Sequence, residues 1–319
     1  MSSSELSVVS LGGGHGLAAT LKSLRSLTTR ITAIVTVADN GGSSGRLREE
    51  FSFLPPGDLR MALAALCSED EWGRGWAEIL QYRFTSEGEM NGHALGNLLL
   101  SALWNRDGDP VTGIDKVGQL LKIDGRVLPM ALDPLDIEAV FDCDGVERSV
   151  KGQVQVATTK GEIKSLTLIP STPRFTPEAA SAIAEADWIT FGPGSWFSSV
   201  MPHLLLKEEA DAIASSAAKK IVIFNLPEPH GAKEFAGSST ADHLRLMLQH
   251  APSLTVDYAL VDSHSVATEE QLSDLKEVVE SCGGKVIVSD LRSAKEAIHH
   301  DVNKLTLALS HIFNATLLR

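Results

Sequence analysis

The sequence has few cysteines, no long apolar run and no evident targeting segment. Its 3 cysteines, Cys67, Cys143 and Cys282, lie far apart and lack the spacing of metal ligands. Such a sparse, odd set fits a reduced compartment better than a disulfide framework. No apolar run reaches membrane-spanning length, and residues 1–6 lack the basic and apolar parts of a signal peptide. We therefore expect a cytoplasmic protein without a membrane span.

Basic charge is also scarce, because 28 lysines and arginines face 41 acidic residues, for a net charge of −13. This balance argues against bulk attraction to nucleic acid or to anionic lipid. An anionic ligand must therefore be held locally, by loop amides, helix N-termini and a few arginines. Apolar residues make up 43% of the 319 residues, which is enough for the core of one large α/β domain.

The first third of the chain alternates between strands and helices. Residues 6–11 and 31–35 read as buried strands, and residues 17–27 read as an amphipathic helix after the first of them. A stop at Pro55-Pro56-Gly57 precedes a helix over residues 59–67, for which Asp58 would be the N-cap. Further helices are expected at 72–82, 94–104 and 110–121.

The middle of the chain changes character. From Arg126 to Ile169 the pattern is β-rich, and Ser149–Thr158 alternates as a half-exposed strand would. We interpret this part as a small antiparallel β subdomain, inserted at about 124–170. After it the chain returns to buried strands at 187–191, 221–224, 258–261 and 286–288, separated by helices at 177–185, 208–218, 241–250 and 269–281.

Repeated strand–loop–helix units predict a mostly parallel, Rossmann-like three-layer sheet, with residues 1–319 forming a single α/β domain. Ligands bind such sheets beyond the carboxyl ends of the strands. Four polar or glycine-rich loops leave strand ends, and the topology would bring them to one edge. They are residues 12–16, 38–46, 192–199 and 225–238.

The first loop, Gly12-Gly-Gly-His-Gly16, opens a helix whose N-terminus favours anions. It departs from the dinucleotide fingerprint, because Leu17 stands where the third glycine belongs. We predict ligand contacts from Gly13, Gly14, His15 and Gly16. A tight turn without a ligand is the alternative, in which His15 merely fills the turn.

The second loop lies within Thr36–Arg48 and combines glycines, serines, an acid and arginines. Asp39 stands where a ribose-binding acid would lie, although it could equally form a turn. Backbone amides and hydroxyls of such a loop can cradle a phosphate, and an arginine can neutralise it. The predicted cradle consists of Asn40, Gly41, Gly42, Ser43, Ser44 and Arg46.

Other candidates are more scattered. Arg60 is unusual in a first helical turn, where the dipole disfavours a cation unless an anion binds there. His93 and Asn97 are spaced to share one helix face, although both could simply bond to the backbone. The list of candidate ligand-binding residues is completed by Asp58, Gly192, Gly194, Ser195, Ser198 and Asn225, whereas His230, His264, His299 and His300 are expected at the surface. No group of residues has the spacing of a metal site.

Together these stretches resemble the YvcK-like gluconeogenesis-factor family, within the superfamily of CofD-like 2-phospho-L-lactate transferases. The matching segments include "LGGGHGL", "VADNGGSSGRLREE", "LPPGDLRMALAAL", "GHALGNLLLSAL" and "FGPGSWFSSVMPHLLL". Most members of the family have threonine at the place of His15 and aspartate at the place of Asn40. Losing that carboxylate weakens the case for a metal held by an aspartate pair.

The resemblance implies a cytoplasmic protein that binds UDP-sugars such as UDP-N-acetylglucosamine and acts in cell shape and envelope metabolism during gluconeogenic growth. A protein partner in envelope regulation and a homodimer are further expectations. The alternative is a magnesium-dependent transferase that uses a nucleotide-diphosphate-activated donor, as in the superfamily. A nicotinamide-dependent oxidoreductase is a third reading, against which the imperfect glycine fingerprint counts. We assign no other cofactor and no catalytic residue.

Overall fold

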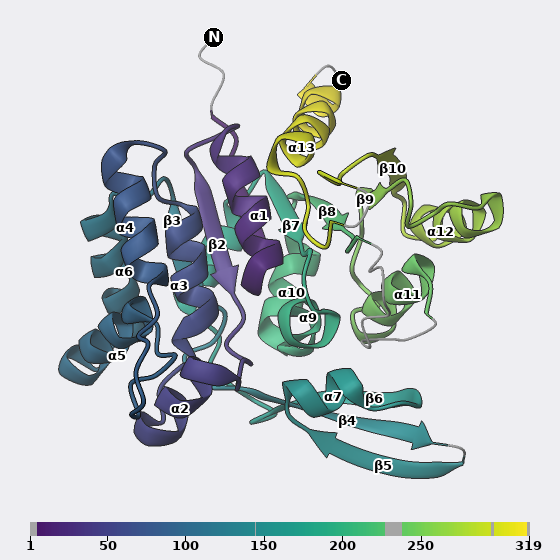
Figure 1. Ribbon diagram of the computed structural model, residues 1–319. Helices are drawn as coiled ribbons and strands as arrows, with labels where there is room; N and C mark the ends of the chain where they lie inside the picture. Colours follow the sequence, from purple (N-terminus) through teal and green to yellow (C-terminus); the bar gives the residue numbers. More distant parts are fainter. Residues whose placement is uncertain (1–4, 144, 227–237, 295–296, 318–319) are drawn as a thin grey trace.

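A computed structural model describes residues 5–143, 145–226, 238–294 and 297–317, and it contains a large parallel sheet with helices on both faces and a second, small sheet (Figure 1). The large sheet consists of β1 (Val8–Gly12), β2 (Ile31–Val35), β3 (Arg126–Pro129), β7 (Trp188–Phe191), β8 (Lys219–Ile223), β9 (Tyr258–Asp262) and β10 (Lys285–Ser289). The small sheet consists of β4 (Asp136–Cys143), β5 (Val146–Lys151) and β6 (Glu162–Ile169). The α/β fold class predicted from the sequence, including an antiparallel sheet, is confirmed.

The helices lie between and around these strands. They are α1 (Gly14–Arg25), α2 (Gly42–Phe51), α3 (Pro56–Ala65), α4 (Glu71–Gln81), α5 (Leu95–Asp107), α6 (Pro110–Leu121), α7 (Gln153–Thr158), α8 (Pro177–Ala184), α9 (Met201–Leu205), α10 (Lys207–Ser215), α11 (Thr240–His250), α12 (Glu269–Ser281) and α13 (Val302–Leu317), with a π-helical turn η1 (Trp196–Val200) before α9. No described helix combines the length and apolar character that a membrane crossing requires.

The order of the strands creates a switch point in the large sheet. The seven strands lie in the order β10-β9-β8-β7-β1-β2-β3, and every pair of neighbours is parallel. The chain therefore leaves β1 in one direction to build β2 and β3, and later builds β7 to β10 in the other direction. The loops that follow β1 and β7 diverge to opposite faces, which leaves a crevice at the carboxyl edge between them.

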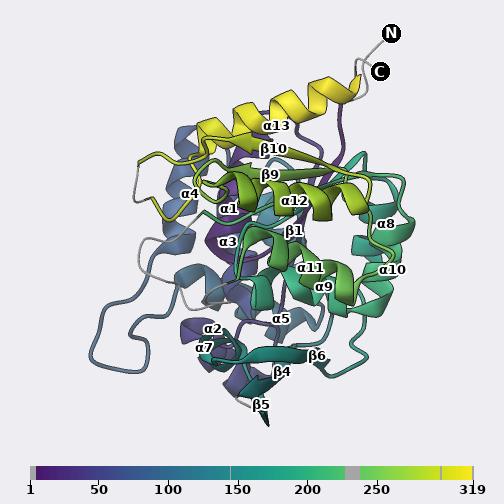
Figure 2. The ribbon, with the colours of Figure 1, turned by 90° about the vertical axis from the view of Figure 1, so that its right-hand side faces the viewer.

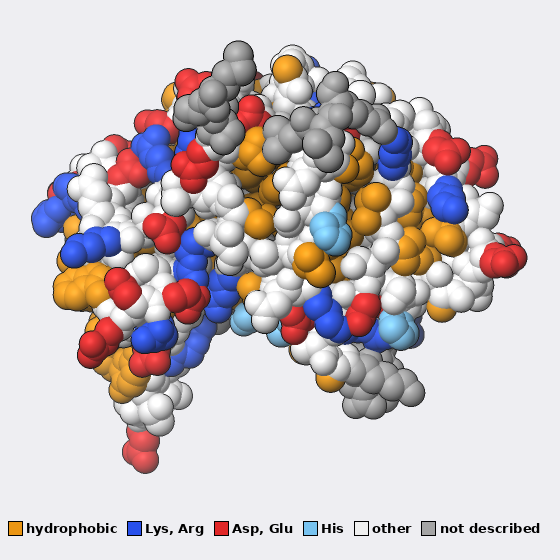
Figure 3. All heavy atoms as spheres, turned by 90° about the horizontal axis from the view of Figure 1, so that it is seen from above, with side chains coloured by type: hydrophobic (Ala, Val, Ile, Leu, Met, Phe, Trp, Pro, Cys, Tyr) orange, Lys and Arg blue, Asp and Glu red, His pale blue; other side chains and the backbone are white. Residues whose placement is uncertain are grey.

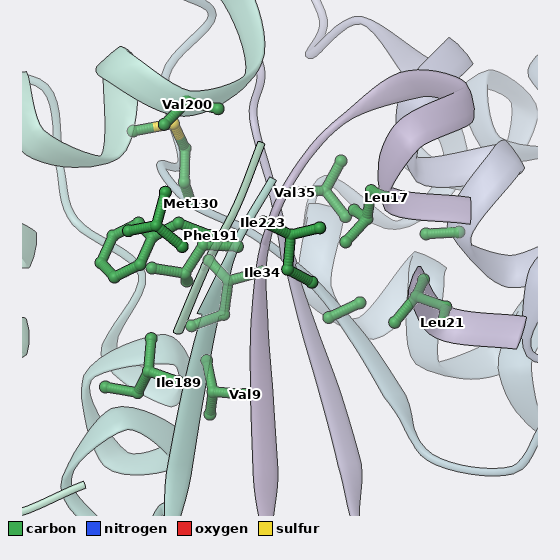
Figure 4. Close-up of a cluster of buried hydrophobic side chains, with 14 of the residues drawn as sticks. Val9, Leu17, Leu21, Ile34, Val35, Met130, Ile189, Phe191, Val200 and Ile223 are labelled. Carbon is green, nitrogen blue, oxygen red and sulfur yellow. The ribbon is translucent and has the colours of Figure 1, made fainter. Parts of the chain in front are cut away.

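The central strands β1, β2, β7, β8 and β9 are largely buried on both faces, and most of their side chains are apolar, whereas the edge strand β10 is partly exposed. In Figure 4, Leu17 and Leu21 of α1 lie on one side of the strands, whereas Ile189 and Phe191 lie on the other. The recurrence of leucine at i, i+4 and i+7 along α1 gives the helix one apolar stripe. The two faces of the sheet thus carry two halves of one continuous core.

Two β-rich segments differ from the prediction. Arg126–Pro129, expected in the antiparallel subdomain, pairs in parallel with β2 and is the edge strand β3. Ser149–Thr158 is not one strand, because Gly152 adopts a φ of 99° and the chain turns into α7. Alternating residues fit both a strand and a short helix, and here Val156 is buried against the core from the helix.

Helix α3 begins earlier than expected. Its N-cap is Pro55 and its first residue is Pro56, whose fixed φ suits that position. Asp58 therefore lies inside the first turn and is not the N-cap. The predicted helices over 110–121 and 269–281 agree with α6 and α12.

The small sheet lies beyond the carboxyl edge of the large sheet, as Figures 1 and 2 both show. Arg48 of α2 ties the two parts together, because its guanidinium donates to the Leu135 carbonyl (2.8 Å) and pairs with Asp136 (3.0 Å). Lys151 also pairs with Asp136, at 3.3 Å. By fixing the small sheet to α2, these contacts place α7 at the open end of the crevice.

Close packing at the switch point makes a specific stability prediction. A Cβ on Gly16 would overlap the carbonyl oxygen of Pro193, so Gly16→Ala forces the two loops apart. Gly75 lies within α4 with open space around it, so Gly75→Ala meets nothing. We expect Gly16→Ala to lower the free energy of unfolding by about 1–3 kcal/mol. We expect Gly75→Ala to raise it by about 0.5–1 kcal/mol.

Urea denaturation of Gly16→Ala and Gly75→Ala measures the two changes in the free energy of unfolding. Equal effects of the two substitutions would contradict the close approach of the loops.

Candidate functional site

A cavity of about 360 Å³ opens at the switch point. It is lined by the loops that follow β1 and β7, by one residue after β2 and two after β8, by α3, and by two more distant segments. The lining residues are Gly13, Gly14, His15, Gly16, Ala19, Asp39, Asp58, Gln153, Pro193, Gly194, Ser195, Ser198, Ser199, Asn225, Leu226, Ile298, His299 and His300. The prediction that loops after separate strands meet at one edge is thus confirmed for the described residues.

The loop after β1 presents backbone to the cavity. Gly13 is the N-cap of α1, and a Cβ on it would overlap the carboxylate of Asp58 and the methyl group of Thr36. Gly14 adopts a φ of 61°, which glycine tolerates best. The first N–H groups of a helix have no partner inside it. Because α1 begins at this loop, its N-terminus provides an anion-binding end at the cavity.

The loop after β7 is held by hydrogen bonds from Asn225, which follows β8, and by hydrogen bonds within the loop. Asn225 clamps Gly194 through two bonds of 2.8 Å, in which its carbonyl oxygen accepts from the Gly194 N–H and its amide donates to the Gly194 carbonyl. The Ser195 hydroxyl accepts from the N–H and the hydroxyl of Ser198, at 3.1 and 2.7 Å. Ser195 is therefore the cap of η1, and Asn225 positions the loop.

Two carboxylates line the cavity. Asp39 accepts a hydrogen bond of 2.9 Å from the Gly41 N–H, and Asp58 accepts one from the Gly14 N–H. Burial raises the pKa of Asp58 to about 7, and the charge of Asp39 adds to this effect, whereas the Gly14 N–H and Arg60 oppose it. Asp58 therefore changes its charge near neutral pH.

Ser43 and Ser44, two of the six residues of the predicted phosphate cradle, lie inside the protein instead. The Ser44 hydroxyl accepts from the Gly57 N–H (3.0 Å), and the Ser43 hydroxyl contacts His93 Nδ1 and Asn97 Nδ2, both at 3.0 Å. His93 precedes α5, so it and Asn97 do not share a helix face, yet both meet at Ser43. These side chains join α2 to α3 and α5, and none of them lines the cavity.

The two arginines of the prediction also have structural partners. Arg46 donates to the carbonyls of Glu89 (2.8 Å) and Asn91 (2.7 Å) and so holds the loop before α5. Arg60 is buried and donates to the Asn97 side chain at 2.8 Å. Burial lowers its pKa to about 10. Neither arginine lines the cavity, nor do Asn40, Gly41, Gly42 and Gly192, so any ligand contact from them remains a prediction.

Sequence reasoning missed part of the lining. His299 is exposed as expected and also lines the cavity, whereas the expectation that His300 lies at the surface is wrong, because it is only 8% exposed and lines the cavity. Gln153 reaches the cavity from α7, and Ser199 packs beside Gly194. No periodicity links these residues to the loop after β1, since only tertiary folding brings them there. His264 is exposed as expected, and His230 lies outside the described residues.

The raised pKa of Asp58 predicts a pH-dependent gain from its neutral analogue. The unfolded chain loses the proton near pH 3.8, whereas the folded chain retains it to about pH 7, so wild-type stability falls across this range. Asp58→Asn removes this loss. Above pH 7 we expect the variant to exceed wild type by more than about 1 kcal/mol, since one unit of pKa corresponds to about 1.4 kcal/mol.

Urea denaturation of Asp58→Asn at about pH 4 and about pH 8 measures this difference. The exposed Asp211→Asn is the control, for which no such trend is expected. An equal gain of the Asp58 variant at both pH values would contradict the shift.

Comparison with known proteins places this fold in a family. The model of the family described as "2-phospho-L-lactate transferase CofD" matches residues 8–306. A Mycobacterium tuberculosis protein named "Putative gluconeogenesis factor" is 44% identical, over 96% of this chain and 90% of its own. A Listeria innocua protein named "Gluconeogenesis factor" is 35% identical, over 95% and 94%.

A solved structure agrees with these matches. The crystal structure of a Bacillus halodurans protein superposes with a TM-score of 0.84 at 31% identity, covering 96% of this chain and 99% of the other. Family model, relatives and fold therefore coincide over nearly the whole chain. The chain belongs to the CofD family, and within it to the group that includes the gluconeogenesis factors.

Proposed function

We propose that this protein binds a nucleotide sugar resembling UDP-N-acetylglucosamine in the cavity at the switch point, and that binding regulates envelope metabolism in the cytoplasm. The observation that supports this best is the N-terminus of α1, which opens into the cavity through Gly13, Gly14 and Gly16. Such helix ends bind phosphate groups in many α/β proteins. Several relatives are named gluconeogenesis factors, which fits a role in carbon metabolism.

The cavity offers two kinds of surface to such a ligand. The glycine loop of α1 and the Ser195–Ser199 turn offer backbone N–H and hydroxyl groups, which suit a diphosphate. Gln153, Leu226 and Ile298 offer amide and apolar groups, which suit a base or sugar. The volume of about 360 Å³ lies in the range of small-molecule sites. The ligand would therefore contact both α1 and α7.

Binding without turnover is the simpler reading of the side chains. The Ser195 hydroxyl accepts two hydrogen bonds from Ser198 as a helix cap. The cysteines lie outside the cavity lining, and burial raises the pKa of the Cys67 thiol to about 11. A regulator needs only that the ligand bind one conformation more tightly than another. A homodimer and a protein partner in envelope regulation remain predictions of this proposal.

Ligand-induced stabilisation tests the proposal. UDP-N-acetylglucosamine at about a hundred times its Kd adds roughly 2.7 kcal/mol to native stability. We expect the unfolding midpoint to rise by about 2 °C or more, since roughly this shift accompanies each kcal/mol in a large domain. Thermal unfolding with UDP-N-acetylglucosamine, UDP-glucose, GDP and NAD, one at a time, gives the ligand preference. A response to NAD or GDP without one to the UDP-sugars would contradict the proposal.

A charge placed in the cavity locates the binding. Ala19 lies on α1 and lines the cavity, so Ala19→Asp adds a carboxylate where the diphosphate would lie. We expect at least about a tenfold weaker Kd, corresponding to about 1.4 kcal/mol. Ala19→Ser is the matched control and is expected to stay within about twofold of wild type. Equal affinities of the two variants would place the ligand elsewhere.

A magnesium-dependent transferase is the second candidate, supported by the family match and by two carboxylates on one cavity. Mg²⁺ is commonly held by one or two carboxylates together with substrate phosphates. Asp39 and Asp58 fit this pattern, since the charge of Asp39 disfavours that of Asp58 and a cation would relieve the repulsion. Bound there, the ion would offset diphosphate charge. No described group of three or more His, Cys, Asp or Glu side chains could hold a metal by itself.

Turnover separates the two candidates. A transferase releases nucleotide from an activated donor in the presence of Mg²⁺, and loses this activity with EDTA or in Asp39→Asn. The regulator that we propose binds the UDP-sugar with or without EDTA and releases no nucleotide. Magnesium-dependent release that disappears in Asp39→Asn would favour the transferase.

A further inference from the structure

Two histidines from distant parts of the chain stack at the mouth of the cavity. The ring centroids of His15 and His299 are 5.2 Å apart, and the ring planes differ by 19°. His15 lies in the first turn of α1, and His299 precedes α13. Both side chains are largely exposed and both line the cavity. The imidazoles can therefore respond to solvent and to a ligand.

The surroundings disfavour a charged pair in the absence of an anion. Partial burial lowers the pKa of His15, and the charges of His299 and Arg60 add to this effect. The N-terminal end of α1 also disfavours a cation at His15. These effects disfavour a proton on His15, and a negative ligand would oppose them.

Other charged groups face the same space. Asp39 and Asp58 line the cavity, and Arg60 lies behind Asp58. His300 lines the cavity beside His299, with Asp262 on its other side, and burial lowers its pKa to about 4. The His300 Nε2 atom has no hydrogen-bond partner among the described residues. The histidines and the two carboxylates therefore line the same cavity.

We propose that His15 and His299 form a proton-dependent subsite for the diphosphate of the ligand. This inference rests on the proposed function and adds its regulation by pH. A proton taken up by the pair places an imidazolium against the phosphate oxygens, where a charge-assisted hydrogen bond is stronger than a neutral one. Ligand binding is then thermodynamically coupled to proton uptake by the pair.

Linkage fixes the sign of the effect. A bound diphosphate raises the pKa of the pair, so the complex binds more protons than the free protein. Affinity is therefore highest below the pKa of the free pair and falls as the pH rises through the pKa in the complex. Asp58 works in the same direction, because its negative charge appears near pH 7. Its contribution must be removed before that of the histidines is measured.

Calorimetric titration with UDP-N-acetylglucosamine tests the subsite in an Asp58→Asn background. The diphosphate of this ligand is doubly esterified and does not titrate between about pH 5.5 and about pH 8. We expect its Kd to rise about tenfold across this range, since one unit of pKa shift is a factor of ten. Adding His15→Gln and His299→Gln should reduce the change to less than about twofold and abolish proton uptake, measured in two buffers of different ionisation enthalpy.

His311→Gln is the matched control. His311 is exposed on α13 and does not line the cavity, so this variant should retain the tenfold change. Binding with the same Kd at both pH values, or a pH dependence that survives both histidine substitutions, would overturn the subsite and leave the proposed function intact. Absence of binding at both pH values in wild type would overturn the proposed function and the subsite together.

Discussion

The close approach of the loops after β1 and β7 is the constraint on which the rest of the site depends. At the switch point these loops pack backbone against backbone, with Gly16 against Pro193 and Gly194. A side chain at Gly16 would force the two loops apart. The N-terminus of α1 and the Ser195 turn face one cavity only because the loops touch. The same contacts that close the core thus define the site.

The charge of Asp58 in the cavity lowers the stability of the folded chain, but it gives the cavity a group that titrates near neutral pH. Asp58 is held beside Asp39 in a partly buried position, which raises its pKa to about 7. Such a shift destabilises the folded chain at neutral pH and is typical of functional sites. On the face seen in Figure 3, acidic and basic side chains are interspersed, with apolar side chains between them.

Local patterns predicted the elements better than they predicted the side-chain partners. The strands over 6–11 and 31–35 and the glycine loop after the first were recognisable because apolar runs and glycine turns are local signals. Ser43 resembled a phosphate ligand, but its hydroxyl binds His93 and Asn97 of a distant segment. Sequence spacing does not show whether a polar side chain faces a neighbouring helix or a cavity.

The same limit explains the missed histidines. His299 meets His15 only after the whole sheet has formed, and nothing near residue 299 in the sequence indicates a ligand. The strand predicted over Ser149–Thr158 is wrong for another reason. Gly152 with its positive φ divides this segment, and the alternation is too short to distinguish a strand from a helix. Both errors arise where tertiary contacts decide between locally equivalent conformations.

The position of Gln153 has a consequence for how ligand preference can diverge. This residue belongs to α7 on the small sheet, which the Arg48–Asp136 pair fastens to the main body. One wall of the cavity is therefore built by a segment that makes no strand of the parallel sheet. Substitutions in α7 can therefore alter which ligand the cavity accepts while the glycine loop of α1 stays unchanged. The two parts of the lining can change independently of each other.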